Sequence, residues 1–360
     1  MAHPADPDQD LDWNMQPPAG LLDWSTASRV GGRLAGRGPT LTKIQRARVV
    51  EDFAEQVGEA ERLVGEFTGL SHEGYRARSW VMNRSEWIDA NLRGFQRVLE
   101  PLASGALRRH GMNPGALRRK VLAAQVGTLM GYVSRKVLGQ YDLFLPPDDD
   151  GLIYFVGPNV VEVEQRFRFP KRDFRMWLCL HEVTHRIQFG AVPWLKAFLE
   201  RQIEDYLSQI EIDPKRVLEA VKKAAEEVRQ RGARGLDLLP LLMTPGQREI
   251  FERMQGLMAL LEGHATYVMD RLGTVHVKEA DRMARGLQQR RRSSSLERGF
   301  QRMIGFDRKI SQYDTGQRFV AAVVERAGMD GLNRAWESEA HLPTGAEIAH
   351  PDEWLARTSP

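Results

Sequence analysis

An apolar stretch without glycine or proline, residues 176–189, carries two histidines at a spacing of four in the sequence M-W-L-C-L-H-E-V-T-H-R-I-Q-F. Its large apolar side chains predict a buried helix. Residues four apart share one face of a helix, so the imidazoles of His181 and His185 can reach the same ion. Glu182 would then lie beside that ion. The stretch therefore predicts a central helix built around a metal site.

These polar groups are costly to bury among large apolar side chains unless they are paired. A metal ion pairs all of them at once. The alternative is two core histidines with ordinary hydrogen-bond partners and a capping glutamate. The pattern H-E-x-x-H is typical of zinc hydrolases, in which the glutamate acts as general base. We therefore predict that His181 and His185 bind Zn²⁺ and that Glu182 is the catalytic base.

A catalytic zinc needs a third protein ligand and an open position for water. The candidates lie in L-L-E-G-H-A-T-Y-V-M-D, residues 260–270, where Glu262 and His264 sit on a second apolar helix. Gly263 lacks side-chain bulk and would let this helix pack closely against the first. Residues two apart point in different directions on a helix, so only one of the two can bind the ion. We predict Glu262, with His264 as the alternative ligand or as a residue that supports or packs against the site.

Two further roles are assigned from the pattern alone. Asp270 lies two turns after Glu262 and could accept a hydrogen bond from a ligand imidazole, or could be a plain surface carboxylate. Hydrolysis of a carbonyl group also needs a donor that stabilises the developing oxyanion. We predict Tyr313, in K-I-S-Q-Y-D-T-G, because it is expected in a polar loop between two helices. The alternatives are Tyr267, His264 and His341.

Helical periodicity dominates the rest of the chain, and one clear strand is expected at 152–156, before a turn at 157–159. The fold class is therefore mainly α, or α+β with one small sheet. The chain is expected to have a disordered tail (1–20), an N-terminal helical region (21–150) and a catalytic region (151–360), the last two forming one continuous unit. Helices are predicted over 24–38, 40–69, 80–102, 118–138, 160–189 with a break at 169–170, 193–232 as a pair, 244–269, 300–310 and 317–327, with a loop at 288–299 and an irregular C-terminal tail.

Composition excludes several classes of protein. The chain has 51 basic and 48 acidic residues, a net charge of +3, which gives no reason to expect nucleic acid as a partner. The single cysteine, Cys179, allows neither an internal disulfide nor a cysteine-based zinc cluster, and is expected in the core. We find no secretory signal and no apolar run long enough to span a membrane. We therefore expect a cytoplasmic protein, and we predict no oligomeric state.

Several blocks of sequence resemble one known family. They are S-E-W-I-D-A-N-L-R-G-F, V-L-G-Q-Y-D-L-F-L-P, C-L-H-E-V-T-H-R-I-Q-F, L-L-E-G-H-A and G-M-D-G-L-N-R-A-W. In this order, from about Trp24 to Trp354, they resemble the actinobacterial zincin-like metallopeptidases of type 2, and more narrowly a hydrolase branch associated with coenzyme F-420 biosynthesis. The resemblance implies a mostly helical, zincin-like fold with the H-E-x-x-H helix at its centre. It also implies Glu262 as third ligand, but no binding of that coenzyme.

The sequence thus predicts a zinc hydrolase of the metallopeptidase type that cleaves a peptide bond or the amide bond of a small molecule. One alternative is a metal-dependent hydrolase of a small amide or ester in cofactor metabolism. Another, of a different class, is a scaffold or binding protein that the metal only stabilises. An intact Glu182 argues against the scaffold, because a structural metal site has no use for a general base.

Overall fold

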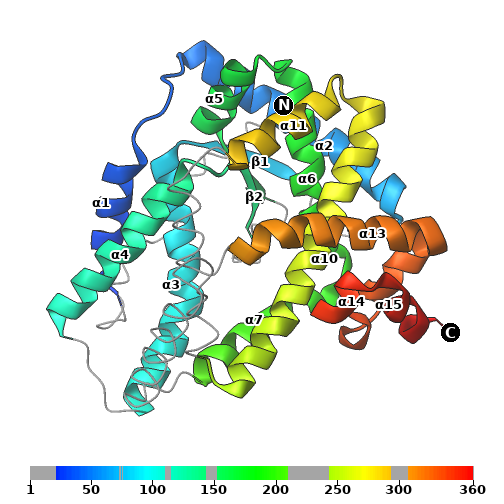
Figure 1. The fold of residues 1–360 in the computed structure, drawn as a ribbon. Coiled ribbons are helices and arrows are strands. Elements are labelled where there is room, and N and C mark those ends of the chain that lie inside the picture. Colours follow the sequence, from blue (N-terminus) through cyan, green and yellow to red (C-terminus); the bar gives the residue numbers. More distant parts are fainter. Residues whose placement is uncertain are drawn as a thin grey trace, which may run out of the picture.

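The computed structural model describes residues 22–72, 74, 76–109, 115–142, 152–209, 243–292 and 307–359, with side chains described outside 102–109, 291–292 and 307–314. Helices make up most of this part of the chain, and one three-stranded sheet accompanies them (Figure 1). The prediction of a mainly α fold with one small sheet is confirmed. The elements are α1 (Trp24–Ala35), α2 (Lys43–Thr68), β1 (Arg78–Met82), α3 (Arg84–Arg109), α4 (Ala116–Ser134), β2 (Gly139–Tyr141), β3 (Leu152–Val156), α5 (Gly157–Phe167), α6 (Lys171–Ala191), α7 (Pro193–Ser208), α10 (Pro245–His276), α11 (Ala280–Arg292), α13 (Asp307–Asn333), the short 3₁₀ helices η2 (Arg334–Trp336) and η3 (Glu339–His341), α14 (Gly345–Ala349) and α15 (Pro351–Thr358).

Local sequence signals fix both ends of α2 and the start of α10. α2 begins at a capping box, in which Thr42 and Gln45 satisfy each other's backbone N–H groups. It ends at Gly69, whose left-handed φ of 69° suits glycine. α10 begins at a second capping box formed by Thr244 and Gln247. These caps agree with the predicted helix boundaries to within about two residues.

The sheet joins segments that are distant in sequence. β3 is its central strand; β1 pairs with it in parallel and β2 pairs with it antiparallel, so β2 is an edge strand. The predicted helix over 80–102 is wrong at its start, because Trp80 belongs to β1 and pairs with Tyr154. The turn predicted at 157–159 is also wrong. Those residues form the first turn of α5, where Pro158 needs no hydrogen-bond donor.

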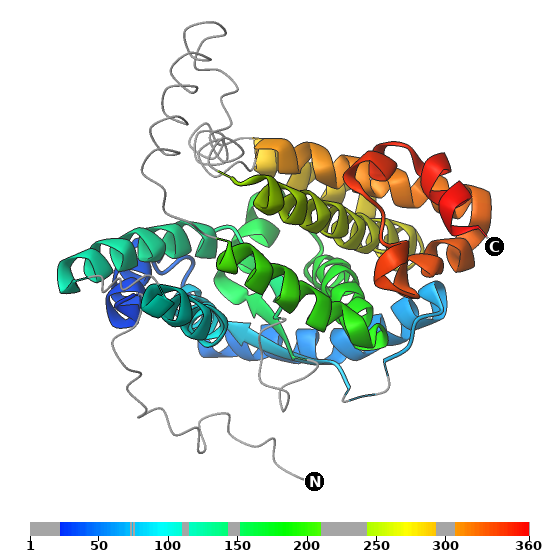
Figure 2. The ribbon, with the colours of Figure 1, turned by 90° about the horizontal axis from the view of Figure 1, so that it is seen from below.

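The helix that contains the two spaced histidines, α6, lies between α2 and α10, and Figure 2 shows it enclosed by these neighbours. The main core forms around it from buried residues of α2, β3 and α6, and the rings of Phe53 and Phe155 stack with centroids 3.8 Å apart. α1, α3 and α4 form a neighbouring group with its own apolar cluster. Cys179 is fully buried in the main core, as predicted. The tail predicted at 1–20 lies outside the described residues.

Three predictions for the C-terminal third of the chain differ from the structure. α13 runs unbroken from Asp307 to a kink at Gly328, so Tyr313 lies within a helix rather than in a polar loop. Gly316, at the end of the segment that was predicted as a loop, allows α13 to approach α10 closely. The C-terminal tail, expected to be irregular, forms η2, η3, α14 and α15. The loop predicted at 288–299 begins inside α11, and the helices predicted within 210–232 and 300–306 lie outside the described residues.

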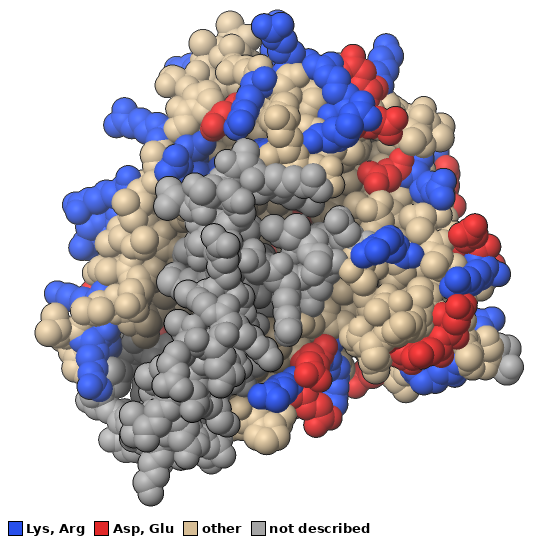
Figure 3. Space-filling model, in the orientation of Figure 1, with Lys and Arg blue, Asp and Glu red and all other residues tan. Residues whose placement is uncertain are grey.

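Charged side chains are spread over the surface. On the face shown in Figure 3, Lys and Arg gather along the upper and left margins, whereas acidic and basic side chains alternate over the lower right part. This mixture agrees with the small net charge of the chain. Among the described helices, none is both long and apolar enough to cross a membrane.

Candidate metal centre

α6 presents two imidazoles to one point. His181 and His185 are one turn apart, their rings lie edge to face with centroids 4.8 Å apart, and their Nε2 atoms are separated by 3.3 Å. The helix forms because its other faces are apolar and buried, from Phe174 to Ile187. Both histidines lie on the side of α6 that faces α10, and each keeps a small exposed area.

α10 brings a carboxylate to the same point. Oε2 of Glu262 lies 3.5 Å from Nε2 of His181 and 3.7 Å from Nε2 of His185. One ligand atom from each of the three residues lies within 4.8 Å of the others, and no other such group of His, Cys, Asp and Glu occurs among the described residues. The structure therefore brings together the three residues that the sequence predicts as ligands.

The role expected for Gly263 is different in the structure. A Cβ atom at Gly263 would lie 2.3 Å from the backbone carbon of Gly316, and one at Gly316 would lie 2.1 Å from the carbonyl oxygen of Ala259. Gly263 therefore allows α10 to pack closely against α13 rather than against α6. This contact fixes α10 against α13 one residue from Glu262.

The spacing of the three ligand atoms fits zinc. Ligand atoms bound tetrahedrally at about 2.0–2.1 Å from an ion are separated from one another by about 3.3–3.4 Å. The observed separations, 3.3, 3.5 and 3.7 Å, are close to that value. Two imidazoles and one carboxylate are also a donor set found in catalytic zinc sites. The residues present therefore fit a zinc ion without rearrangement.

Charge attraction between the ligands is visible in their pKa values. Burial alone would lower the pKa of His185, but the Glu262 carboxylate outweighs it and raises the pKa to about 9. Burial would conversely raise the pKa of Glu262, but the two nearby imidazoles hold it well below its usual range. Without a metal, His185 is thus a cation held against an anion. A divalent cation would take over the role of that proton.

Glu182 lies next to the ligands and is held by the edge strand. Its Oε2 atom accepts a hydrogen bond of 3.2 Å from the backbone N–H of Tyr141, in β2. A Cβ atom at Gly139 would lie 2.7 Å from Oε1 of Glu182, so a larger residue there would push this carboxylate aside. Burial raises the pKa of Glu182, although the two histidines oppose this. A carboxylate with a raised pKa is suited to accept a proton near neutral pH.

His264 does not face the metal point. It is fully buried, with a ring centroid 5.6 Å from that of Trp336, and burial lowers its pKa to about 3, so it is neutral. Its Nδ1 atom lies 3.0 Å from Nε2 of Gln188. Gln188 was not singled out from the sequence. Its position, three residues after His185 and so close to the same face of α6, is a weak signal that could have drawn attention to it.

The remaining predicted residues lie elsewhere. Asp270 accepts a hydrogen bond of 2.7 Å from Gln317, and the Nδ1 atom of His181 is buried without a hydrogen-bond partner, so Asp270 does not orient that imidazole. Tyr267 packs against Phe67, and His341 contacts Ser338 and Glu337. The side chain of Tyr313 lies outside the described residues.

The centre opens into a cavity of about 420 Å³. Residues that sequence analysis did not assign line it beside the predicted ligands: the three residues of β2, the chain leading into them, the apolar faces of α6 and α10, and the end of α11. They are Lys136, Val137, Leu138, Gly139, Gln140, Tyr141, Trp177, Leu178, Met269, Leu287 and Arg290. The sequence V-L-G-Q-Y was visible only as part of the family resemblance, because a three-residue strand is too short for a periodicity signal.

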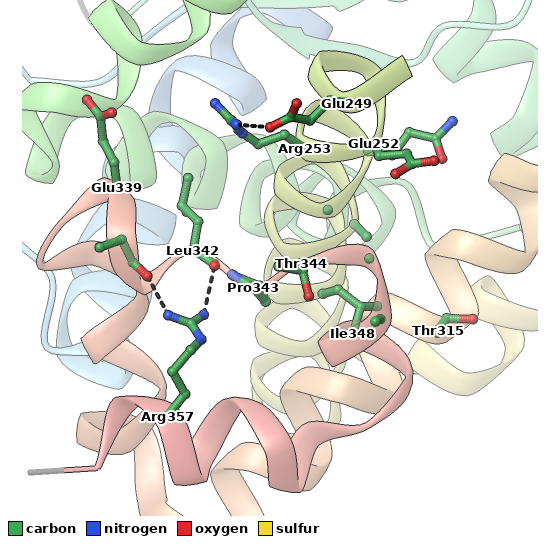
Figure 4. A pocket seen from close by; sticks show the side chains of 16 residues that line it. Glu249, Glu252, Arg253, Thr315, Glu339, Leu342, Pro343, Thr344, Ile348 and Arg357 are labelled. Atoms are coloured by element: carbon green, nitrogen blue, oxygen red, sulfur yellow. Dashed lines mark hydrogen bonds and ion pairs between the residues drawn. The ribbon is translucent and has the colours of Figure 1, made fainter. Parts of the chain in front are cut away.

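A larger cavity of about 820 Å³ lies between the first half of α10 and the C-terminal helices (Figure 4). Its charged lining residues are largely paired with protein groups. Arg253 binds Glu249 at 3.0 Å, and Arg357 donates to Glu347 and to the carbonyl of Leu342. No His lines this cavity. The side chains that can bind a metal or transfer a proton therefore converge in the smaller cavity.

Two histidines and a glutamate from two packed helices, with a second glutamate beside them, form a candidate metal centre of the kind that zincin-type hydrolases use. The family model for zincin-like metallopeptidases matches residues 22–355, and the chain belongs to this family. The narrower branch named after coenzyme F-420 stays a prediction.

A solved structure supports the same assignment. The crystal structure of "a putative hydrolase with a novel fold" from Chloroflexus aurantiacus is 30% identical in sequence, with a TM-score of 0.71, and the match covers 93% of this chain and 98% of that chain. Among curated proteins, none matches the chain. The family and the structure together support a hydrolase of the zincin type.

Proposed function

We propose that the protein is a zinc-dependent hydrolase that cleaves an amide or peptide bond. One observation carries this proposal: the side chains of His181, His185 and Glu262 converge at zinc spacing, with the Glu182 carboxylate beside them, inside an open cavity. A bound Zn²⁺ would lower the pKa of water to about 7 and polarise the carbonyl group of the substrate.

Glu182 supplies the proton transfers. Its carboxylate takes a proton from the attacking water and passes it to the nitrogen of the leaving amine. The hydrogen bond from the Tyr141 N–H keeps one carboxylate oxygen in place and leaves the other for this exchange. The raised pKa of Glu182, which follows from its burial, brings the carboxylate closer to the pH at which it must both accept and release a proton.

The cavity favours a short substrate. About 420 Å³ is at the lower end of the range for small-molecule sites. Its wall includes all of β2, the edge strand of the sheet, and strand edges are a recurring binding surface for extended peptides. We therefore propose a short peptide or a small amide as substrate. A panel that compares di- and tripeptides with small amides and esters distinguishes a peptidase from a hydrolase of cofactor metabolism.

The scaffold alternative predicts a closed metal site. A structural zinc site has four protein ligands, whereas the described residues offer three, facing a cavity. Zinc held by a fourth protein side chain, as detected by X-ray absorption spectroscopy, would favour the scaffold.

The experiment that tests the proposed function is Glu182→Gln. This variant keeps all three ligands but cannot accept a proton, so we expect kcat to fall by at least about 100-fold while one zinc per chain is retained. Glu59→Gln is the matched control, because Glu59 is an exposed glutamate that pairs with Arg62 on the surface of α2. Metal content and turnover of the best substrate are measured for both. Full activity in Glu182→Gln would overturn the mechanism.

A further inference from the structure

We propose that Gln188 and His264 position the metal ligands: together they fix the orientation and the proton of the His185 imidazole and tie α6 to α10. This inference rests on the proposed zinc site. Both side chains are fully buried, and the proposed mechanism gives neither of them a role.

The orientation of the Gln188 amide is determined by a backbone group. Nε2 of Gln188 lies 3.0 Å from the carbonyl oxygen of Leu261, which can only accept a hydrogen bond. The NH₂ end of the amide must therefore face α10, and its oxygen must face His185. Oε1 of Gln188 lies 2.9 Å from Nδ1 of His185.

The proton of His185 follows from this orientation. An amide oxygen is only an acceptor, so Nδ1 of His185 must carry the proton. In the neutral imidazole, Nε2 then has a free lone pair, and Nε2 is the atom that lies toward His181 and Glu262. Metal-bound histidines commonly donate their other N–H to a carbonyl or carboxylate, which fixes the tautomer and the ring orientation. Gln188 supplies that acceptor here.

His264 completes the arrangement. The amide has a second hydrogen, and Nδ1 of His264 lies 3.0 Å from Nε2 of Gln188. His264 accepts this bond, so its own proton is on Nε2, an atom that is buried without a hydrogen-bond partner. The ring is held against Trp336. A buried polar residue at this position is explained by its role as an acceptor for Gln188.

The same amide also sets the distance between the two ligand-bearing helices. Leu261 directly precedes Glu262, so the bond from Gln188 to its carbonyl connects α6 to α10 one residue from the third ligand. His181 has no comparable support, because its Nδ1 atom is buried without a partner. The structure thus assigns His185 as the anchored imidazole of the pair.

The test compares three glutamine variants by zinc affinity, measured by competition with a chromophoric chelator. Gln188→Met keeps the length and volume of the side chain but loses every hydrogen bond, and we expect zinc binding to weaken by about 10–100-fold. Gln188→Glu keeps the acceptor for His185, so it should bind zinc more tightly than Gln188→Met. Gln56→Met is the matched control: Gln56 is also buried and also donates to a backbone carbonyl, at 2.8 Å, but on α2 away from the cavity.

A purely structural role predicts the opposite order, because Gln188→Glu places a buried charge next to the Leu261 carbonyl and loses two donor bonds. Zinc affinity in Gln188→Met equal to wild type, or weaker in Gln188→Glu than in Gln188→Met, would overturn the inference and leave the proposed function standing. Wild-type protein that binds no zinc would overturn both.

A second variant keeps the test decisive if Gln188→Met does not fold. His264→Phe preserves an aromatic ring beside Trp336 but removes the acceptor, and we expect one zinc per chain to be retained with up to about tenfold weaker affinity. The visible absorption of Co²⁺-substituted protein should shift in this variant, since the His185 ring is less tightly held. Complete loss of metal would instead identify His264 as a ligand and overturn its assignment as a positioning residue. An unchanged affinity and spectrum would overturn it as well.

Discussion

In the metal-free protein, the proton on His185 competes with zinc. Burial would lower the pKa of this imidazole, but Glu262 raises it to about 9. Zinc binds only the deprotonated form, so each unit of pH below 9 should weaken apparent zinc affinity by about tenfold. Apparent zinc affinity should therefore keep rising from pH 6 to about pH 9. With an ordinary histidine, whose pKa is near 6.5, the affinity would reach a plateau above pH 7. Chelator competition at pH 6, 7 and 8 measures this slope, and equal affinities at pH 7 and 8 would contradict the prediction.

At the scale of single residues, spacing in the sequence is informative when one helix carries the whole pattern. His181, Glu182 and His185 are recognisable because the helical repeat alone places them together. Gln188 is three residues further on and was not predicted, because its role depends on Leu261 and His264, which only the packing of α6 against α10 brings within reach. Gly139 was missed for the same reason, since its contact with Glu182 joins a strand to a helix.

At the scale of elements, the contact of α10 with α13 should control the position of Glu262. Gly263→Ala would place a Cβ atom 2.3 Å from the backbone of Gly316, and backbone atoms in two packed helices cannot move aside easily. We expect a loss of about 1–3 kcal/mol in stability from overpacking, together with weaker zinc binding as α10 shifts. Thermal unfolding and chelator competition measure the two effects.

Gly58→Ala serves as the control for this substitution. Gly58 is an exposed glycine within α2, and a Cβ atom there meets nothing within 4 Å. Alanine is favoured over glycine inside a helix by about 1 kcal/mol, so this variant should be at least as stable as wild type with unchanged zinc affinity. Wild-type stability in Gly263→Ala would show that the helices can separate without cost.

Elements with a long, amphipathic repeat were predictable, and those defined by partners were not. The starts of α2 and α10 follow from their capping residues. β1 is five residues long and owes its conformation to pairing with β3, more than 70 residues later, so no local pattern reveals it. The segment K-I-S-Q-Y-D-T-G was interpreted as a polar loop, although it lies in α13, where its glycine, Gly316, allows the close approach to Ala259. A glycine can belong to a loop or allow close packing of two helices, and the two cases cannot be distinguished until the neighbouring helix is known.

At the scale of the whole molecule, one sheet spans the predicted N-terminal and catalytic regions. β1 and β2 come from residues before 150 and β3 from residues after, and Phe53 of α2 stacks on Phe155 of β3. The candidate site depends on both regions, because β2 holds Glu182 and lines the cavity while α6 and α10 supply the proposed ligands. The boundary at 150 is therefore crossed by contacts that the site requires.

Because the ligands come from two helices about 80 residues apart, zinc should stabilise the entire fold. An ion that binds the folded chain and not the unfolded one adds about 2.7 kcal/mol at a free concentration 100 times its Kd. For a chain of this size we expect Tm to rise by a few degrees Celsius over the chelator-treated protein.

Glu262→Ala removes the ligand from α10, so zinc should leave the Tm of this variant nearly unchanged. Mg²⁺ should have no effect on the Tm of either protein, because this donor set suits zinc. Differential scanning calorimetry measures Tm for each protein. Elemental analysis confirms that the zinc-loaded wild type holds one zinc per chain. A zinc-dependent rise of equal size in Glu262→Ala would mean that the ion stabilises the molecule from another place and that α10 contributes no ligand.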